Sequence, residues 1–183
     1  MSTSDALAER YASAPDWPAY LASTVKNHDL WSGIDRHVAI DADQVDLARK
    51  AAERGGVRHV VVLSEDWCGD AVNIVPWVGR LVGMLPGVDL RIFGRDANPD
   101  LMDAHLTGSS RSIPVIILYD SQFRELGWWG PRPTELQALA LGPWCSLPKD
   151  ERYREIRTWY ARDKGSTILA EIIALMSRAS SPA

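Results

Sequence analysis

Hydrophobic residues along this chain alternate between short continuous runs and helical spacing, and the order of these patterns predicts an α/β protein. Three runs rich in β-branched residues are typical of strands buried between layers of helices. They cover residues 57–64, 88–93 and 114–120. Residues 123–129 follow a turn and predict a fourth strand that forms a hairpin with the third.

Apolar residues at helical spacing predict helices between these strands and at both ends of the chain. Gly55 and Gly56 close the second helix, Pro76 is expected to interrupt the third with a kink, and Ser166 is expected to cap the last. The order of strands and helices predicts a central mixed β-sheet flanked by helices, with extra helices at both termini. The predicted helices cover residues 15–35, 43–54, 69–85, 98–106, 133–141, 149–164 and 167–178.

Length and composition fit one domain, with room for an appendage. The chain has 183 residues, 46% of them hydrophobic and 24% charged, which is ordinary for a globular protein with a sizeable core.

Several classes of function are excluded by charge and composition. The net charge of −4 is spread over mixed runs, so we expect no nucleic-acid partner, and no apolar stretch is long enough to predict a membrane span. Two cysteines 77 positions apart make no disulfide framework, and the N-terminus lacks a signal-peptide pattern, which together predict a cytoplasmic protein. The four histidines have no ligand spacing, so we predict no metal and no cofactor. The oligomeric state is left open.

The candidate chemistry lies in the segment SEDWCGDAVNIVPW, residues 64–77. Cys68 falls between a buried strand and the first turn of a helix, where free N–H groups and the helix dipole stabilise a thiolate, the form that attacks disulfides. Asp70 opposes this effect by charge repulsion, and Glu65 and Asp66 add to the negative field, so the thiolate fraction stays open. The alternative is that Cys68 is a small apolar filler. We favour chemistry and expect an exposed sulfur.

Three segments carry a resemblance to the thioredoxin superfamily. WCGDAVNIVP resembles its active-site segment, in which a proline lies eight positions after the cysteine, as Pro76 does. RSIPVIILYD resembles its second signature, which implies that Pro114 is cis, follows Ile113 and faces the cysteine. WWGPRP is similar to the glycine loop that forms a third groove wall, which implies that role for Trp129 and Gly130.

The resemblance covers about residues 57–142 and implies a thioredoxin-like fold for this core. Residues 1–56 are then expected to form an N-terminal helical extension packed on the core, and residues 143–183 a C-terminal helical extension. It is strongest to small bacterial thioredoxin-like proteins with a Trp-Cys-Gly-Asp box. Two positions depart from the superfamily pattern: Ala71 replaces the resolving cysteine, and Val62 replaces the buried acid. Without a second thiol the site can complete only half of a dithiol cycle. Cys145 follows the last core helix, where we expect a packed thiol that does not reach Cys68.

These observations lead to the hypothesis of a monothiol protein that performs thiol–disulfide exchange. Cys68 would attack a protein disulfide or a mixed low-molecular-weight disulfide, and an external thiol such as glutathione would release it. The resemblance implies a substrate groove formed by Trp67, Gly69, Asp70, Ile113, Pro114, Trp129 and Gly130. Whether the protein is an enzyme is left open. The alternatives are a non-catalytic binding or adaptor module, and a peroxide sensor in which the thiol becomes a sulfenic acid.

Other residues have simpler interpretations. Strand alternation predicts Trp128 in the core and Trp129 in the groove. Arg111 is expected to be a solvated surface side chain, with contact to an anionic thiol as the alternative. The charged residues of residues 149–165 predict a solvated helix face with pairs four residues apart.

Overall fold

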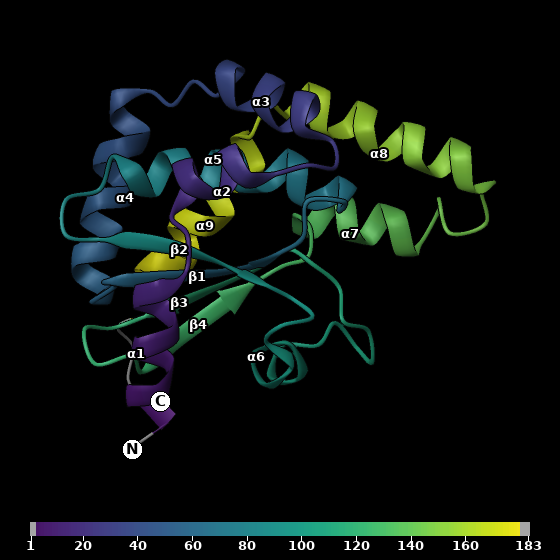
Figure 1. Ribbon diagram of the computed structural model, residues 1–183. Coiled ribbons are helices and arrows are strands. Elements are labelled where there is room, and N and C mark those ends of the chain that lie inside the picture. The colour runs from purple at the N-terminus through teal and green to yellow at the C-terminus, as the bar shows by residue number, and fades with distance from the viewer. Residues whose placement is uncertain (1–2, 180–183) are drawn as a thin grey trace.

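A four-stranded mixed sheet forms the centre of the computed structural model, which describes residues 3–179 (Figure 1). The strands are β1 (His59–Ser64), β2 (Asp89–Gly94), β3 (Val115–Tyr119) and β4 (Glu125–Trp129). Their order is β2-β1-β3-β4, with β1 parallel to β2 and antiparallel to β3. β3 and β4 form the predicted antiparallel hairpin. The ends of the predicted terminal extensions, residues 1–2 and 180–183, lie outside the described residues.

The two central strands contain the most buried part of the chain. Val62 of β1 lies opposite Ile92 of β2 and Ile116 of β3, and Val62 and Ile116 are fully buried. β-branched side chains suit this position because they pack well on a pleated surface that is covered on both faces. The continuous apolar runs of the sequence therefore correspond to strands with helices above and below.

Helices cover both faces of the sheet. Within the described residues they are α1 (Thr3–Ser13), α2 (Trp17–Ser23), α3 (His28–His37), α4 (Ala42–Gly55), α5 (Gly69–Gly83), α6 (Pro99–Ala104), α7 (Thr134–Leu141), α8 (Lys149–Asp163) and α9 (Ser166–Arg178). In Figure 1, α4, α5 and α9 lie above the sheet and α1 and α6 lie below it. α9 packs on α4, α5 and β4, and α3 packs on α5. No helix within residues 3–179 is long and apolar enough to cross a membrane.

The structure corrects three predictions about helices. The single helix expected over residues 15–35 is two helices, because Thr24 ends α2 in an extended conformation and Asn27 begins α3 with a φ of 58°. α5 runs through Pro76 without an interruption. α9 is preceded by Gly165 with a φ of 77°, and Ser166 is its first residue rather than its cap. In contrast, Gly56 ends α4 in the left-handed conformation, as predicted.

A close backbone approach joins the two loops that lie beside the first turn of α5. The peptide bonds Ile113–Pro114 and Gly130–Pro131 are both cis. Gly130 has a φ of 145°, and a Cβ atom built there would overlap the carbonyl oxygen of Pro114. Only glycine fits this position without a shift of backbone. The loop after β4 is thereby held against the loop before β3.

Replacing Gly130 with alanine tests this contact. We expect Gly130→Ala to lower the free energy of unfolding by roughly 2 kcal/mol or more, because the added Cβ meets backbone and the φ is unfavourable for an L-residue. Gly83→Ala is the matched control, since nothing lies within 4 Å of a Cβ built at this helical glycine. Urea denaturation of both variants measures the difference, and equal stability would contradict the assigned packing.

His105 gives the fold a dependence on pH. Its buried ring places Nδ1 2.6 Å from the carbonyl oxygen of Leu101 and Nε2 3.1 Å from Glu125 Oε2. Burial lowers the pKa of His105, but the hydrogen bonds to Glu125 and Leu101 outweigh it and raise the pKa above the usual value. The protonated ring donates both bonds, so its stabilisation is complete below pH about 6.5 and is lost as the pH rises through the folded-state pKa.

We therefore expect stability to fall more steeply above pH about 6.5 in the native protein than in His105→Gln. Urea denaturation at pH 6 and pH 8 measures this difference. A His59→Gln variant serves as the comparison, since His59 is the first residue of β1 and pairs with Asp89 rather than with Glu125. The assignment fails if His105→Gln and the native protein show the same dependence on pH.

Candidate functional site

Cys68 is the N-cap residue of α5, and two backbone groups fix its sulfur. Its φ of −80° and ψ of 118° place it outside the helix, and Sγ accepts a hydrogen bond from the Ala71 N–H at 3.4 Å. The thiol donates to the carbonyl oxygen of Ile113, the residue before the cis-proline, also at 3.4 Å. Cys68 is only 8% exposed. The expectation of an exposed sulfur was therefore wrong, because the loop that carries Ile113 covers it.

The surroundings of Cys68 favour the thiol over the thiolate. Burial raises the pKa of the Cys68 thiol above its usual value, and the charge of Asp70 adds to this effect. The Ala71 N–H and the nearby Arg132 guanidinium act in the opposite direction. The hydrogen bond to Ile113 also requires the proton. The resting site thus holds a protonated sulfur at neutral pH.

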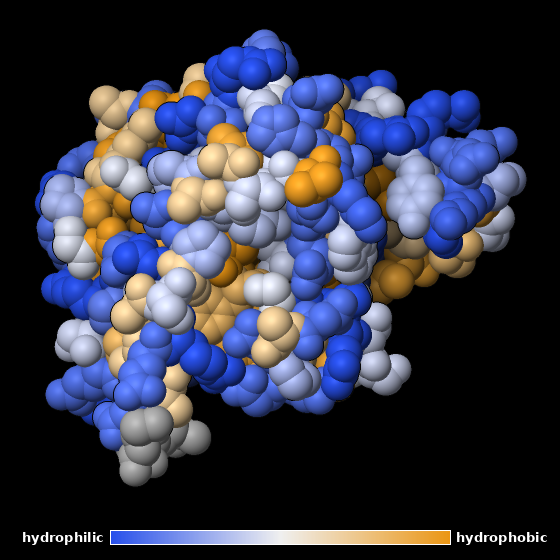
Figure 2. All heavy atoms as spheres, in the orientation of Figure 1, coloured by the Kyte–Doolittle hydropathy of each residue, from blue (hydrophilic) through white to orange (hydrophobic). Residues whose placement is uncertain are grey.

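Cys68 lies on a cleft of about 560 Å³ that helices and loops from distant parts of the sequence enclose. One wall is the start of α5, a second is the loop before Pro114, and α8 forms a third. Figure 2 shows apolar atoms in the recess between the body of the molecule and the lobe that contains α7 and α8. The lining residues include Leu30, Trp67, Asp70, Arg95, Arg111, Ile113, Arg132, Tyr153, Ile156 and Arg157.

A partly buried ion pair links the start of α5 to the loop after β4. Arg132 donates from Nε and Nη2 to the two oxygens of Asp70, at 2.9 and 2.6 Å, and the two side chains are 20% and 14% exposed. The hydroxyl of Tyr160 in α8 donates to Asp70 Oδ1 at 3.0 Å. Burial and the charge of Asp70 raise the pKa of Tyr160, which therefore stays a donor. The carboxylate predicted to repel a thiolate is thus largely neutralised by a bidentate partner.

Asp66 anchors the loop before Cys68 to the loop between α2 and α3. Its Oδ2 accepts the N–H groups of Val25 and Lys26 at 3.0 and 2.8 Å, and its carbonyl oxygen accepts Trp31 Nε1 at 3.0 Å. Burial alone would raise the pKa of Asp66, but the two amide hydrogen bonds lower it below its usual value. Asp66 therefore acts as a structural anchor, and these bonds also explain the break between α2 and α3.

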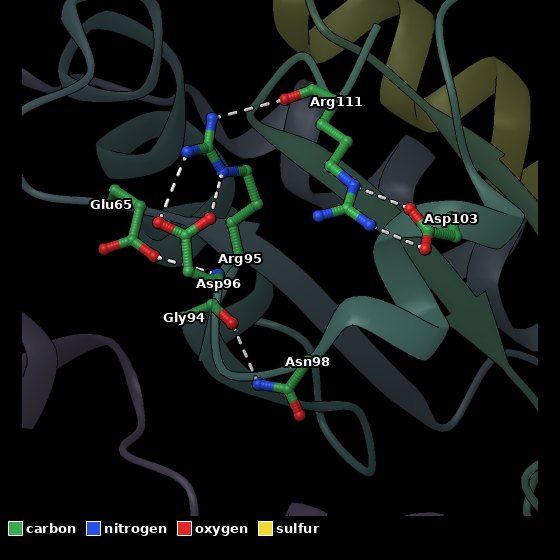
Figure 3. Close-up of polar contacts among 7 residues, drawn as sticks. All are labelled: Glu65, Gly94, Arg95, Asp96, Asn98, Asp103 and Arg111. Carbon is green, nitrogen blue, oxygen red and sulfur yellow. Dashed lines mark hydrogen bonds and ion pairs between the residues drawn. The ribbon is translucent and has the colours of Figure 1, made fainter. Parts of the chain in front are cut away.

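Two arginines, Arg95 and Arg111, line the cleft together with Trp67. Figure 3 shows the polar contacts of both arginines. Arg95 binds Asp96 through Nε at 2.8 Å, donates to the carbonyl oxygen of Arg111 at 3.4 Å, and lies 4.9 Å from the centre of the Trp67 ring. Arg111 binds both oxygens of Asp103 at 2.7 Å. The cationic contact stabilises the position of the 42% exposed indole. Arg111 lines the cleft and is ion-paired, which the sequence did not predict.

The structure brings part of the predicted groove together. Trp67, Gly69, Asp70 and Ile113 line the cleft with Cys68. The other three predicted residues are not among the lining residues: Pro114, Trp129 and Gly130. Pro114 follows the carbonyl that contacts the sulfur and packs on Gly130. Trp129 instead donates from Nε1 to Glu171 of α9 at 2.6 Å.

Sequence reasoning missed the contribution of α8. Most charged side chains of residues 149–165 are exposed, as predicted, but Arg157 also lines the cleft together with Tyr153 and Ile156, and Tyr160 is buried. A signal was present in the sequence, since Tyr153, Ile156, Trp159 and Tyr160 form an apolar stripe at helical spacing. The predicted packing of Cys145 is also wrong, because this free cysteine is exposed and does not line the cleft.

No cluster of three or more histidine, cysteine, aspartate or glutamate residues suited to a metal ion occurs within residues 3–179. Hydrogen-bonded partners account for the histidines that face carboxylates, His59 with Asp89 and His105 with Glu125. The chemical groups of the cleft include one thiol, a partly buried ion pair, further arginine side chains and the polar side chains of Asn27, Asn73, Ser110 and Ser112, beside apolar residues.

Comparisons with known proteins agree with this architecture. No curated protein matches the chain. A crystal structure of a protein of unknown function from Pseudomonas aeruginosa has a TM-score of 0.68 at 17% identity, over 92% of this chain and 95% of that one. An HIV epitope scaffold has a TM-score of 0.65 at 15% identity, with the same coverage of both chains. At these identities the likeness concerns the fold alone.

A family profile described as thioredoxin matches residues 14–154. The match includes the first turn of α5 with Cys68, the cis-prolyl loop and most of the helices that enclose the cleft. It spans more than half of the chain, and the sheet has the mixed order and flanking helices that the resemblance implied. The chain therefore belongs to the thioredoxin-like superfamily.

Proposed function

We propose that this protein carries out thiol–disulfide exchange through the single thiol of Cys68. The observation that carries the proposal is the position of Sγ, which caps α5, touches the carbonyl before the cis-proline and lies on a cleft large enough for a substrate. A cleft of about 560 Å³ is within the range of small-molecule sites. Cys145 is exposed and away from the cleft, so a second thiol must come from solution.

The proposed cycle has two exchange steps. Cys68 loses its proton to solvent, and its thiolate attacks one sulfur of the substrate disulfide. That bond breaks, a mixed disulfide forms on Cys68, and the leaving thiolate takes up a proton. An external thiol then attacks the mixed disulfide and restores the Cys68 thiol. One disulfide is consumed and one is formed in each step, so no further oxidant is needed.

The ion pair of Asp70 and Arg132 tunes the first step. Asp70 alone would disfavour a thiolate on Cys68, and Arg132 offsets this charge through two hydrogen bonds. The raised pKa of Cys68 makes the resting protein a slow nucleophile at neutral pH. A thiol of this kind suits selective reaction with a bound substrate better than indiscriminate oxidation.

A non-catalytic binding module is the second candidate, and the burial of the sulfur favours it. Cys68 is 8% exposed and its pKa is raised, which are also the properties of a structural cysteine. In that case the cleft with Trp67 and Tyr153 would bind a partner without exchange. The two candidates differ in one respect: Cys68→Ser, whose hydroxyl can cap α5 in the same way, abolishes function only in the first.

Adduct formation tests the exchange proposal. In a Cys145→Ala background, we expect bis(hydroxyethyl) disulfide to form a mixed disulfide at Cys68 that reduced mercaptoethanol reverses. The rate should rise about tenfold per pH unit from pH 7 to pH 8, because the thiolate fraction of a thiol with a raised pKa grows in this range. Intact mass spectrometry measures both. Cys68→Ser in the same background is the control. Absence of an adduct in the Cys68 protein would reject exchange and favour the binding module.

The Asp70→Asn variant tests the electrostatic assignment. Removing the negative charge and leaving Arg132 in place should lower the pKa of Cys68. Thiolate fraction rises tenfold per unit of pKa and nucleophilicity falls about threefold, so alkylation by iodoacetamide at pH 7 should accelerate roughly threefold per unit. Asp43→Asn, an exposed change in α4, is the matched control. An unchanged or slower rate in Asp70→Asn would show that this ion pair does not control the thiol.

A further inference from the structure

Four arginines and one aspartate are the charged residues that line the Cys68 cleft. They are Arg95, Arg111, Arg132 and Arg157, and Asp70, which is paired with Arg132. The chain as a whole carries a net charge of −4, so the cleft has the opposite sign from the molecule. A concave surface lined by one sign of charge concentrates ligands of the other sign. This distribution favours an anionic occupant next to the sulfur.

The four arginines differ in whether a carboxylate of the same chain already forms an ion pair with them. Arg132 forms an ion pair with Asp70. Figure 3 shows the ion pairs of Arg95 with Asp96 and of Arg111 with Asp103. The side chain of Arg157 is exposed and forms no ion pair or hydrogen bond among residues 3–179. Its position in α8 therefore provides a free guanidinium on the wall that faces the start of α5.

Apolar surface surrounds this free cation. Tyr153 lies one turn before Arg157 on α8 and is 45% exposed, and Leu30 of α3 is 47% exposed. Both line the cleft together with Trp67, whose exposed indole is held by Arg95. A ligand that complements the cleft thus has a carboxylate, which can pair with the planar guanidinium group, and a compact apolar part, which can contact the apolar lining.

From these features we infer that the cleft selects small disulfides that carry carboxylates, and that Arg157 binds a carboxylate while Cys68 attacks the sulfur. This inference rests on the proposed exchange at Cys68 and adds the charge class of its substrate. The chemistry is unchanged: the ligand disulfide breaks, a mixed disulfide forms on Cys68, and the departing thiolate is protonated by solvent. Arg157 is a binding residue and takes no part in the bond changes.

Three symmetrical disulfides test the inference: dithiodipropionate is anionic, bis(hydroxyethyl) disulfide is neutral and cystamine is cationic. In the Cys145→Ala background we measure the rate of adduct formation at Cys68 by intact mass spectrometry, with urea-unfolded protein as the reference for intrinsic reactivity. Relative to that reference, the folded protein should prefer the anionic probe. Arg157→Gln should slow the anionic probe roughly two- to fivefold and leave the neutral probe unchanged, as expected for one partly exposed charge pair.

Two control variants isolate the charge at this position. Arg157→Lys should keep most of the preference, and Arg154→Gln, an exposed change on the same helix that does not line the cleft, should keep all of it. High salt should reduce the preference of the native protein, because exposed charges are screened.

The outcomes separate the inference from the function on which it rests. Charge selection by Arg157 is rejected if the three probes react with the folded protein at the same relative rates as with the unfolded protein. It is also rejected if Arg157→Gln slows the neutral and anionic probes equally. In both cases exchange at Cys68 stands. If no probe forms an adduct, exchange at Cys68 is rejected and the inference falls with it. A preference for cystamine would reverse the assigned charge class.

Discussion

The hydrogen bonds of one sulfur atom connect the parts of this structure that matter for its chemistry. Sγ of Cys68 accepts from the Ala71 N–H and donates to the Ile113 carbonyl, so it joins the first turn of α5 to the loop before the cis-proline. The same geometry buries the sulfur and keeps its proton. Reactivity therefore depends on a substrate or a pH that displaces this internal bond, because the thiolate cannot donate to a carbonyl.

The loops that carry this contact are fixed by interactions across long stretches of sequence. Asp66 binds the backbone between α2 and α3, and Gly130 packs against the carbonyl of Pro114. Asp70 receives hydrogen bonds from Arg132 and from Tyr160, which draws α8 onto the site. The hydrogen bonds of Asp70 satisfy partly buried polar groups, and the close approach at Gly130 requires a residue without a side chain.

Helix α8 supplies one wall of the cleft around Cys68. The first turn of α5 and the cis-prolyl loop lie within the residues that the thioredoxin profile matches, 14–154. The wall opposite them comes from α8, whose Tyr153 and Arg157 add an aromatic surface and a free charge to the cleft. A positive cleft on a protein with a net charge of −4 points to recognition of a small anion beside the thiol.

The sequence by itself determined the α/β class, the four strands, the thioredoxin-like fold and the position of Cys68 at a strand-to-helix junction. These features follow from local patterns, such as the β-branched run of residues 57–64, and from ordered motifs. Only the tertiary structure decided that the sulfur is buried, that Arg132 neutralises Asp70 and that α8 lines the cleft, because these contacts join residues 45 to 90 positions apart. Spacing along a chain carries no information about such distant neighbours, whereas packing in the folded state brings them together.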